Sequence, residues 1–120
     1  MAIATDEGLN VIAAAIAGAA SFVAIGTGTT AESTSDTNLV SETARVVASG
    51  SATNNVATIS GTITATNSNI VIQETGLFSG GSGTADTGTL MARHTQRFDN
   101  TVENPFDITV GFIITVERID

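Results

Sequence analysis

FDITVGFIITVE, residues 106–117, is the most regular segment of the chain. Successive side chains of a β-strand point to opposite faces, so its period of two predicts one strand of roughly twelve residues with a buried face. The only proline, Pro105, lies at the start of this strand, where a missing N–H costs least. The expected buried residues are Phe106, Ile108, Val110, Phe112, Ile114 and Val116.

The same alternation occurs at residues 57–66, where apolar residues and glycine alternate with Thr and Ser. Shorter apolar runs predict further strands at 21–25, within 39–49, at 70–74 and at 90–96. We expect turns at 50–55 and 66–69, a bend at 76–78 and a glycine-rich excursion at 79–88. Strands at this spacing predict a mainly β protein, an antiparallel, jelly-roll-like β-sandwich with one N-terminal α-helix.

The N-terminal part has helical spacing instead. Apolar residues at i, i+3, i+4 and i+7 predict an amphipathic helix over about 6–17 that lies on the sheet. Thr5 is placed to cap its start, and Gly18 to end it in the left-handed conformation. We expect one domain, 1–120, with the helix in 1–20 and the sandwich in 21–120. The expected buried stripe is Leu9, Ile12, Ala13 and Ile16.

The uncharged segment 9–25 does not predict a membrane span or a signal peptide. It is rich in alanine and interrupted by Asn10, Gly18 and Ser21, so it falls short of the apolar length that a spanning helix needs. Acidic residues precede it, where a signal peptide has basic ones.

The composition argues against several classes of function. The 120 residues include 12 acidic and only 4 basic ones, with no lysine, for a net charge of −8. Such a chain is poorly suited to neutralise phosphates, which argues against nucleic acid and anionic membranes as partners. There is no cysteine, which excludes disulfides and thiolate metal sites, and a single histidine argues against a His-rich zinc site.

Two motifs could carry chemistry, and for both the structural interpretation is preferred. Gly26-Thr27-Gly28 could cradle a phosphate, but no Walker lysine or third glycine accompanies it, so we interpret it as a turn. His94 could be a catalytic base, but the chain has no Gly-x-Ser-x-Gly elbow beside it. We therefore expect no catalytic residue, no cofactor and no metal site.

Glu74 is the most informative charged residue. Its parity in the 70–74 strand places it on an apolar face, where an unpaired carboxylate would be costly. We expect a structural ion pair with Arg45 or Arg93, or hydrogen bonds to turn amides beside Gly76. The alternative is a metal ligand or an acid catalyst.

The order of several motifs resembles a family of small structural proteins of tailed viruses, from bacteriophages or archaeal viruses. The matching segments are Gly8-Leu9-Asn10, 23–31 with VAIGTGTTA, 36–39 with DTNL followed by Glu42 and Arg45, 72–78 with IQETGLF, 88–93 with GTLMAR, and 107–116. The chain differs from the family at Phe112, where a tryptophan is usual, and at Val11, where a basic residue often occurs. The resemblance implies a tail-fibre-associated or head-decoration protein in which Glu74 and Arg93 define the fold and have no catalytic role.

We therefore expect a non-enzymatic component of a virion, located on the capsid as a decoration or turret or on the tail as a fibre-anchoring module. Its expected partners are its own copies, as a trimer or pentamer, and other virion proteins such as the major capsid or tail proteins. The expected contact surface is the helix face with Val11, Ala14 and Ala15, together with the edge of the 106–116 strand. The alternative is a carbohydrate-binding or host-attachment module, although the chain has no Trp or Tyr to stack on sugars.

Overall fold

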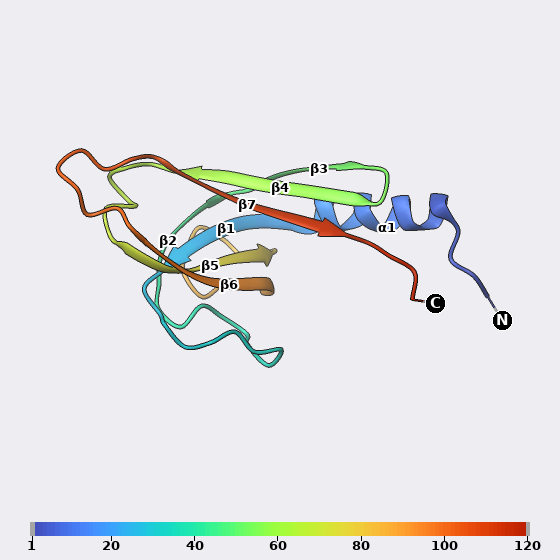
Figure 1. The fold of residues 1–120 in the computed structure, drawn as a ribbon, viewed down its shortest axis with the longest axis horizontal. Coiled ribbons are helices and arrows are strands. Elements are labelled where there is room, and N and C mark those ends of the chain that lie inside the picture. Colours follow the sequence, from blue (N-terminus) through green and yellow to red (C-terminus); the bar gives the residue numbers. More distant parts are fainter. Residues whose placement is uncertain (1, 120) are drawn as a thin grey trace.

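The structure is a computed structural model that describes residues 2–119. These residues form one helix and seven strands, and the strands make two antiparallel sheets (Figure 1). One sheet has the order β2-β1-β5-β6, and the other has the order β3-β4-β7. This confirms the predicted fold class, a mainly β sandwich with one N-terminal helix. The elements are α1 (Asp6–Ala19), β1 (Ala20–Gly26), β2 (Glu42–Val47), β3 (Ser49–Thr53), β4 (Val56–Ile63), β5 (Val71–Ser79), β6 (Thr89–Asp99) and β7 (Ile108–Thr115).

The described chain is elongated, with extents of 56 × 26 × 24 Å. The three-stranded sheet is the reason, because β3 and the start of β4 reach past the other sheet and lie over α1 (Figure 1). The helix approaches β3 very closely: a Cβ atom added to Gly50 would lie 2.5 Å from the carbonyl oxygen of Ala17. A glycine at this position is therefore part of how the helix docks.

The helix begins as predicted and ends later. The Thr5 side chain accepts a hydrogen bond from the N–H of Gly8, as expected of an N-cap. Gly18 does not end the helix, because the chain continues to Ala19 and passes straight into β1 through Ala20 in an extended conformation. Because no turn intervenes, no left-handed residue is required there.

The predicted buried stripe of the helix is partly wrong. Leu9 and Ala13 are buried and Ile16 is partly buried, but the Ile12 side chain is 47% exposed. The buried face is centred on Ala13 and includes Ala17. These small residues let the helix backbone lie close to the sheet, which leaves the longer Ile12 on the flank.

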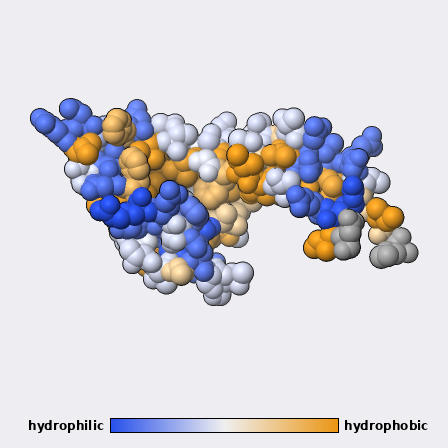
Figure 2. Space-filling model, viewed as in Figure 1, coloured by the Kyte–Doolittle hydropathy of each residue, from blue (hydrophilic) through white to orange (hydrophobic). Residues whose placement is uncertain are grey.

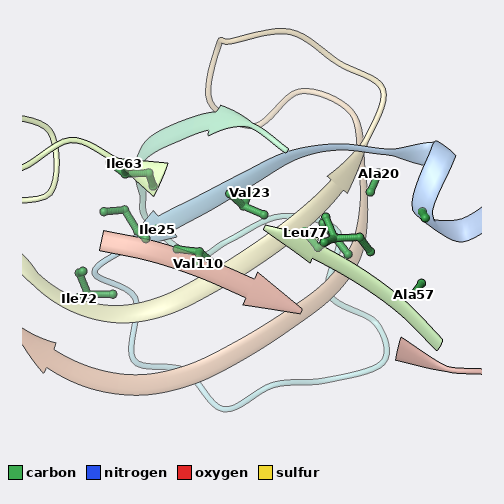
Figure 3. Close-up of a cluster of buried hydrophobic side chains, with 10 residues drawn as sticks. Ala20, Val23, Ile25, Ala57, Ile63, Ile72, Leu77 and Val110 are labelled. Atoms are coloured by element: carbon green, nitrogen blue, oxygen red, sulfur yellow. The ribbon is translucent and has the colours of Figure 1, made fainter. Parts of the chain in front are cut away.

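Both sheets and the helix contribute to one main core (Figure 3). Val23 and Ile25 of β1, Leu77 of β5 and Ile59 of β4 are fully buried, and Val110 of β7 is nearly so. The predicted alternation of β4 is confirmed, since Ala57, Ile59 and Ile63 are buried. The sandwich therefore forms by burial of the period-two faces that the sequence displays.

Three strand predictions need correction. Residues 49–53 form β3 instead of a turn, because the reversal is confined to Asn54 and Asn55, with Asn54 in the left-handed region at φ 53°. The chain does not bend away at 76–78, because Gly76 continues β5 and pairs with Ala24 and Arg93 on either side. The last strand has eight residues instead of about twelve.

Phe106 lies outside the last strand and is 64% exposed, so its predicted place in the core is wrong. Its backbone is held by the buried side chain of Asn100, which accepts from the Phe106 N–H (3.0 Å) and donates to its carbonyl oxygen (2.9 Å). The Ser68 hydroxyl donates to the same carbonyl oxygen. This side-chain clamp uses the backbone groups that a strand would pair, so the ladder begins at Ile108.

Candidate functional site

Glu74, on β5, is a fully buried carboxylate surrounded by donors. Its Oε2 atom accepts from the N–H groups of Gly28 (2.7 Å) and Ser41 (2.8 Å), and its Oε1 atom from the N–H of Val40 (2.8 Å) and from Arg93 Nε (3.0 Å). Burial alone would raise the pKa of Glu74, but these four donors outweigh it, so the pKa lies below its ordinary value. The carboxylate is therefore charged at neutral pH and fully engaged.

Arg93, on β6, extends this network to the loop between β1 and β2. Its guanidinium donates to Asp36 Oδ2 (3.2 Å) and to the carbonyl oxygen of Thr30 (2.7 Å), and its side chain is only 2% exposed. Glu74 and Arg93 thus tie the long 27–41 loop to the sheet. Of the two partners that the sequence suggested for Glu74, Arg93 is correct. The expected amides beside Gly76 are wrong, because Gly76 continues β5 and the amides that bind the carboxylate come from the loop between β1 and β2.

The Gly26-Thr27-Gly28 turn serves this carboxylate. The Gly28 N–H points to Glu74, and a Cβ atom at Gly28 would lie 2.5 Å from Glu74 Oε2. The turn therefore needs glycine because the carboxylate approaches closely. Its amide is occupied by a protein group, which favours the structural interpretation over a phosphate loop.

Arg45 forms a second buried centre and does not contact Glu74. It makes two hydrogen bonds to Glu42, at 2.6 and 2.7 Å, and its guanidinium carbon lies 4.4 Å from the ring centre of Phe78. It also donates to the carbonyl oxygens of Ser82 and Thr87, at 3.1 Å each. The expected Arg45 to Glu74 pairing is therefore wrong; Arg45 instead fixes the 80–88 loop, which sequence reasoning did not anticipate.

His94 lies at the surface of β6, with its side chain 61% exposed. Its ring contacts Gln96 (Nε2 to Oε1, 3.3 Å) and lies 3.9 Å from Glu32. Hydrogen bonds from the Thr95 hydroxyl and N–H lower the pKa of Glu32. These contacts give His94 no buried carboxylate that would orient it as a catalytic base.

The predicted assembly residues of the helix are accessible. Val11, Ala14 and Ala15 are exposed, with Val11 at 68%, and they lie on the side of α1 opposite Ala13. Gly18 continues this side. From Val11 to Gly18, over about two turns, the outer face of the helix is therefore made of small or apolar residues.

The β7 strand forms an open edge of its sheet, beside a groove that the sequence did not predict. The groove has a volume of about 390 Å³ and runs between β6 and β7. Its apolar lining includes Ile72, Phe98, Ile108 and Val110. Apolar surface continues along the middle of the molecule, between more polar ends (Figure 2). On the outer face of β7, Ile113 is an apolar residue at a position where the alternation calls for a polar one, and its side chain is 75% exposed.

Other features of residues 2–119 point to structural roles. Every buried side-chain polar atom in this range has a hydrogen-bond partner. Within the same residues, no cluster of three metal-ligating side chains occurs, and no helix is long and apolar enough to cross a membrane. No protein-family model matches the chain, and neither a curated protein nor a solved structure is significantly similar to it.

Proposed function

We propose that this chain is a non-enzymatic structural subunit of a tailed-virus particle, which assembles as a symmetric oligomer on the capsid or the tail. The observation that carries the proposal is the unprotected edge of β7. Natural edge strands usually carry charges, proline or a bulge that prevent pairing with another chain. From Ile108 to Thr115 the strand has no charged residue and no proline, and its register with β4 is uninterrupted.

The outer face of α1 supplies the second contact surface. Val11, Ala14 and Ala15 present little polarity to solvent, and small side chains allow a neighbouring subunit to approach closely. A contact between this face and a different surface of the next copy is head-to-tail. It closes into a ring when the rotation between neighbouring copies divides a full turn, as in the trimer or pentamer that the sequence led us to expect.

The particle location rests on the resemblance of the sequence motifs to small tailed-virus structural proteins. The buried Glu74 and Arg93 network is compatible with this reading, because its donors and acceptors satisfy one another. In the proposed particle, the partners are other copies of the chain and major capsid or tail proteins.

The test is the substitution Ala14→Glu, with Thr37→Glu in the exposed loop as a control of equal charge. We expect Ala14→Glu to reduce the mass of the assembled species in sedimentation experiments, with an unchanged far-UV circular dichroism spectrum and an assembled control. Unchanged assembly, or unfolding of the Ala14→Glu subunit, would contradict the helix contact. Glycan-array binding by a monomeric wild-type chain would favour the carbohydrate-binding alternative.

The particle location has its own test. Peptide mass spectrometry of purified tailed-virus particles, from cells that carry the gene, should detect the chain in amounts comparable to other structural proteins. Detection only in the unassembled fraction would contradict this part of the proposal.

A further inference from the structure

No contact within the subunit requires a glycine at position 111, in the middle of β7. It is not in the left-handed region, and an added Cβ atom would meet only ordinary contacts, Ile59 O at 3.8 Å and Ser60 Cβ at 4.0 Å. Gly50 differs, because a Cβ atom there would collide with α1. A glycine inside a strand weakens it and often marks a place where another chain approaches.

The exposed Ile113 lies two residues further along, on the same face of the sheet as Gly111. The Val116 N–H donates to the Asn55 carbonyl oxygen at 2.8 Å, in register with the β4–β7 ladder. Backbone groups alternate in direction along an antiparallel strand, so the even-numbered residues of β7 bond to β4. The odd-numbered residues, including Gly111 and Ile113, direct their N–H and C=O groups to the open edge.

We propose that β7 pairs antiparallel with β7 of a second copy about a two-fold axis at Phe112, with each Ile113 lying opposite Gly111 of the other copy. This inference rests on the proposed function, since it specifies one of the contacts in the oligomer. Only this centre places the large exposed side chain against the glycine in both directions at once. The same register puts Thr109 opposite Thr115, which adds polar cross-strand pairs.

The apolar groove supports a second copy as the occupant. In this register Ile114 of the second copy lies opposite Val110, and both side chains are on the inner face of the sheet. That position is beside the groove lined by Phe98 and Ile72, so the pairing extends the core over it. The chain carries a net charge of −8, but β7 itself is uncharged, so within the strand the pairing places no like charges opposite each other. The pairing is therefore confined to Ile108–Thr115, because one residue further the register would bring Asp107 opposite Glu117 of the other copy.

The two proposed contacts have different symmetry. The β7 contact is isologous and by itself gives a dimer, whereas the contact through α1 closes a ring. Together they give an assembly with twice as many subunits as the ring. Loss of the β7 contact should therefore leave rings, and loss of the helix contact should leave dimers.

The register is tested with single cysteines, since the natural chain has none. In this register Gly111 and Ile113 of the other copy form a hydrogen-bonded pair. The Cα atoms of such a pair are about 5.5 Å apart, within the range that a disulfide spans. We expect a mixture of Gly111→Cys and Ile113→Cys to form a disulfide-linked dimer under mild oxidation. Each variant alone should form far less, because its two cysteines are offset by two residues in this register. Equal crosslinking in either variant alone would overturn the register.

The contact itself is tested with Gly111→Pro. The N–H that proline removes faces the open edge, so the β4–β7 ladder is retained, but the second strand is blocked. We expect the dissociation constant of the β7 contact to rise at least tenfold with an unchanged circular dichroism spectrum. If this variant fails to fold, Ile113→Thr replaces it, with Val47→Thr, at an exposed position of β2, as the control. Wild-type assembly that is unchanged by these substitutions overturns the inference, whereas a monomeric wild-type chain overturns the proposed function.

Discussion

Replacing Glu74 by glutamine should remove much of the stability of the fold without changing the volume of the side chain. An amide NH₂ group would take the place of one carboxylate oxygen. If the NH₂ group replaces Oε2, the N–H groups of Gly28 and Ser41 lose their acceptor. If it replaces Oε1, the N–H group of Val40 and the Nε–H group of Arg93 lose theirs. In either orientation, two buried donors face another donor.

The expected cost follows from these losses. An unsatisfied buried donor costs about 1–3 kcal/mol, and breaking a buried ion pair by changing one partner costs about 3–5 kcal/mol. We therefore expect Glu74→Gln to lower the free energy of unfolding by about 3–5 kcal/mol at pH 7. A domain of this size has a total of about 5–15 kcal/mol, so the variant should be marginally stable.

The assay is urea unfolding followed by far-UV circular dichroism, which gives the free energy of unfolding by linear extrapolation. Glu103→Gln, at an exposed position, is the matched control and should stay within about 0.5 kcal/mol of the wild type. A loss below about 1 kcal/mol for Glu74→Gln would refute the view that this carboxylate organises the fold.

Three further predictions concern stability. Because the pKa of Glu74 is lower in the folded chain, the stability that its charge provides is present above its ordinary pKa of 4.5 and is lost as the pH falls through the folded value. The urea midpoints of the wild type should therefore decrease from pH 5 to pH 3 and converge with those of Glu74→Gln. A constant difference between the two midpoints would contradict this. The single ammonium of Arg45→Lys cannot keep both hydrogen bonds to Glu42 and those to the 80–88 loop. We expect the free energy of unfolding to fall by about 2 kcal/mol and the amide hydrogens of that loop to exchange faster. Unchanged exchange would contradict the role of Arg45. Gly50→Val should push α1 from β3 and cost about 1–3 kcal/mol, measured by thermal unfolding, and an unchanged melting temperature would contradict the close docking at Ala17.

The sequence predicts the fold class because hydrophobic period and secondary structure are directly related. The alternation in β4 and the capping of α1 at Thr5 depend on neighbouring residues and are confirmed. The position of β3 could not be predicted in this way, because its Ser, Gly, Ala and Thr residues resemble a turn. They form a strand because a tight turn at Asn54 returns the chain along β4.

The candidate site was predictable only in part, for a similar reason. Strand parity placed Glu74 on an apolar face and therefore required a partner, but parity does not say which arginine lies nearest in space. Arg93 is the partner because β5 and β6 are adjacent, whereas Arg45, on β2, is separated from β5 by β1. The open edge at Ile113 and the groove beside it depend on which strands are outermost, and strand order is not encoded in local periodicity.

Sedimentation velocity of the wild-type chain over a wide concentration range measures directly whether the chain assembles. We predict a mass several times that of the single chain, which decreases on dilution as the two contacts dissociate. A single monomeric species up to several hundred micromolar, well above the concentrations at which specific interfaces associate, would contradict it.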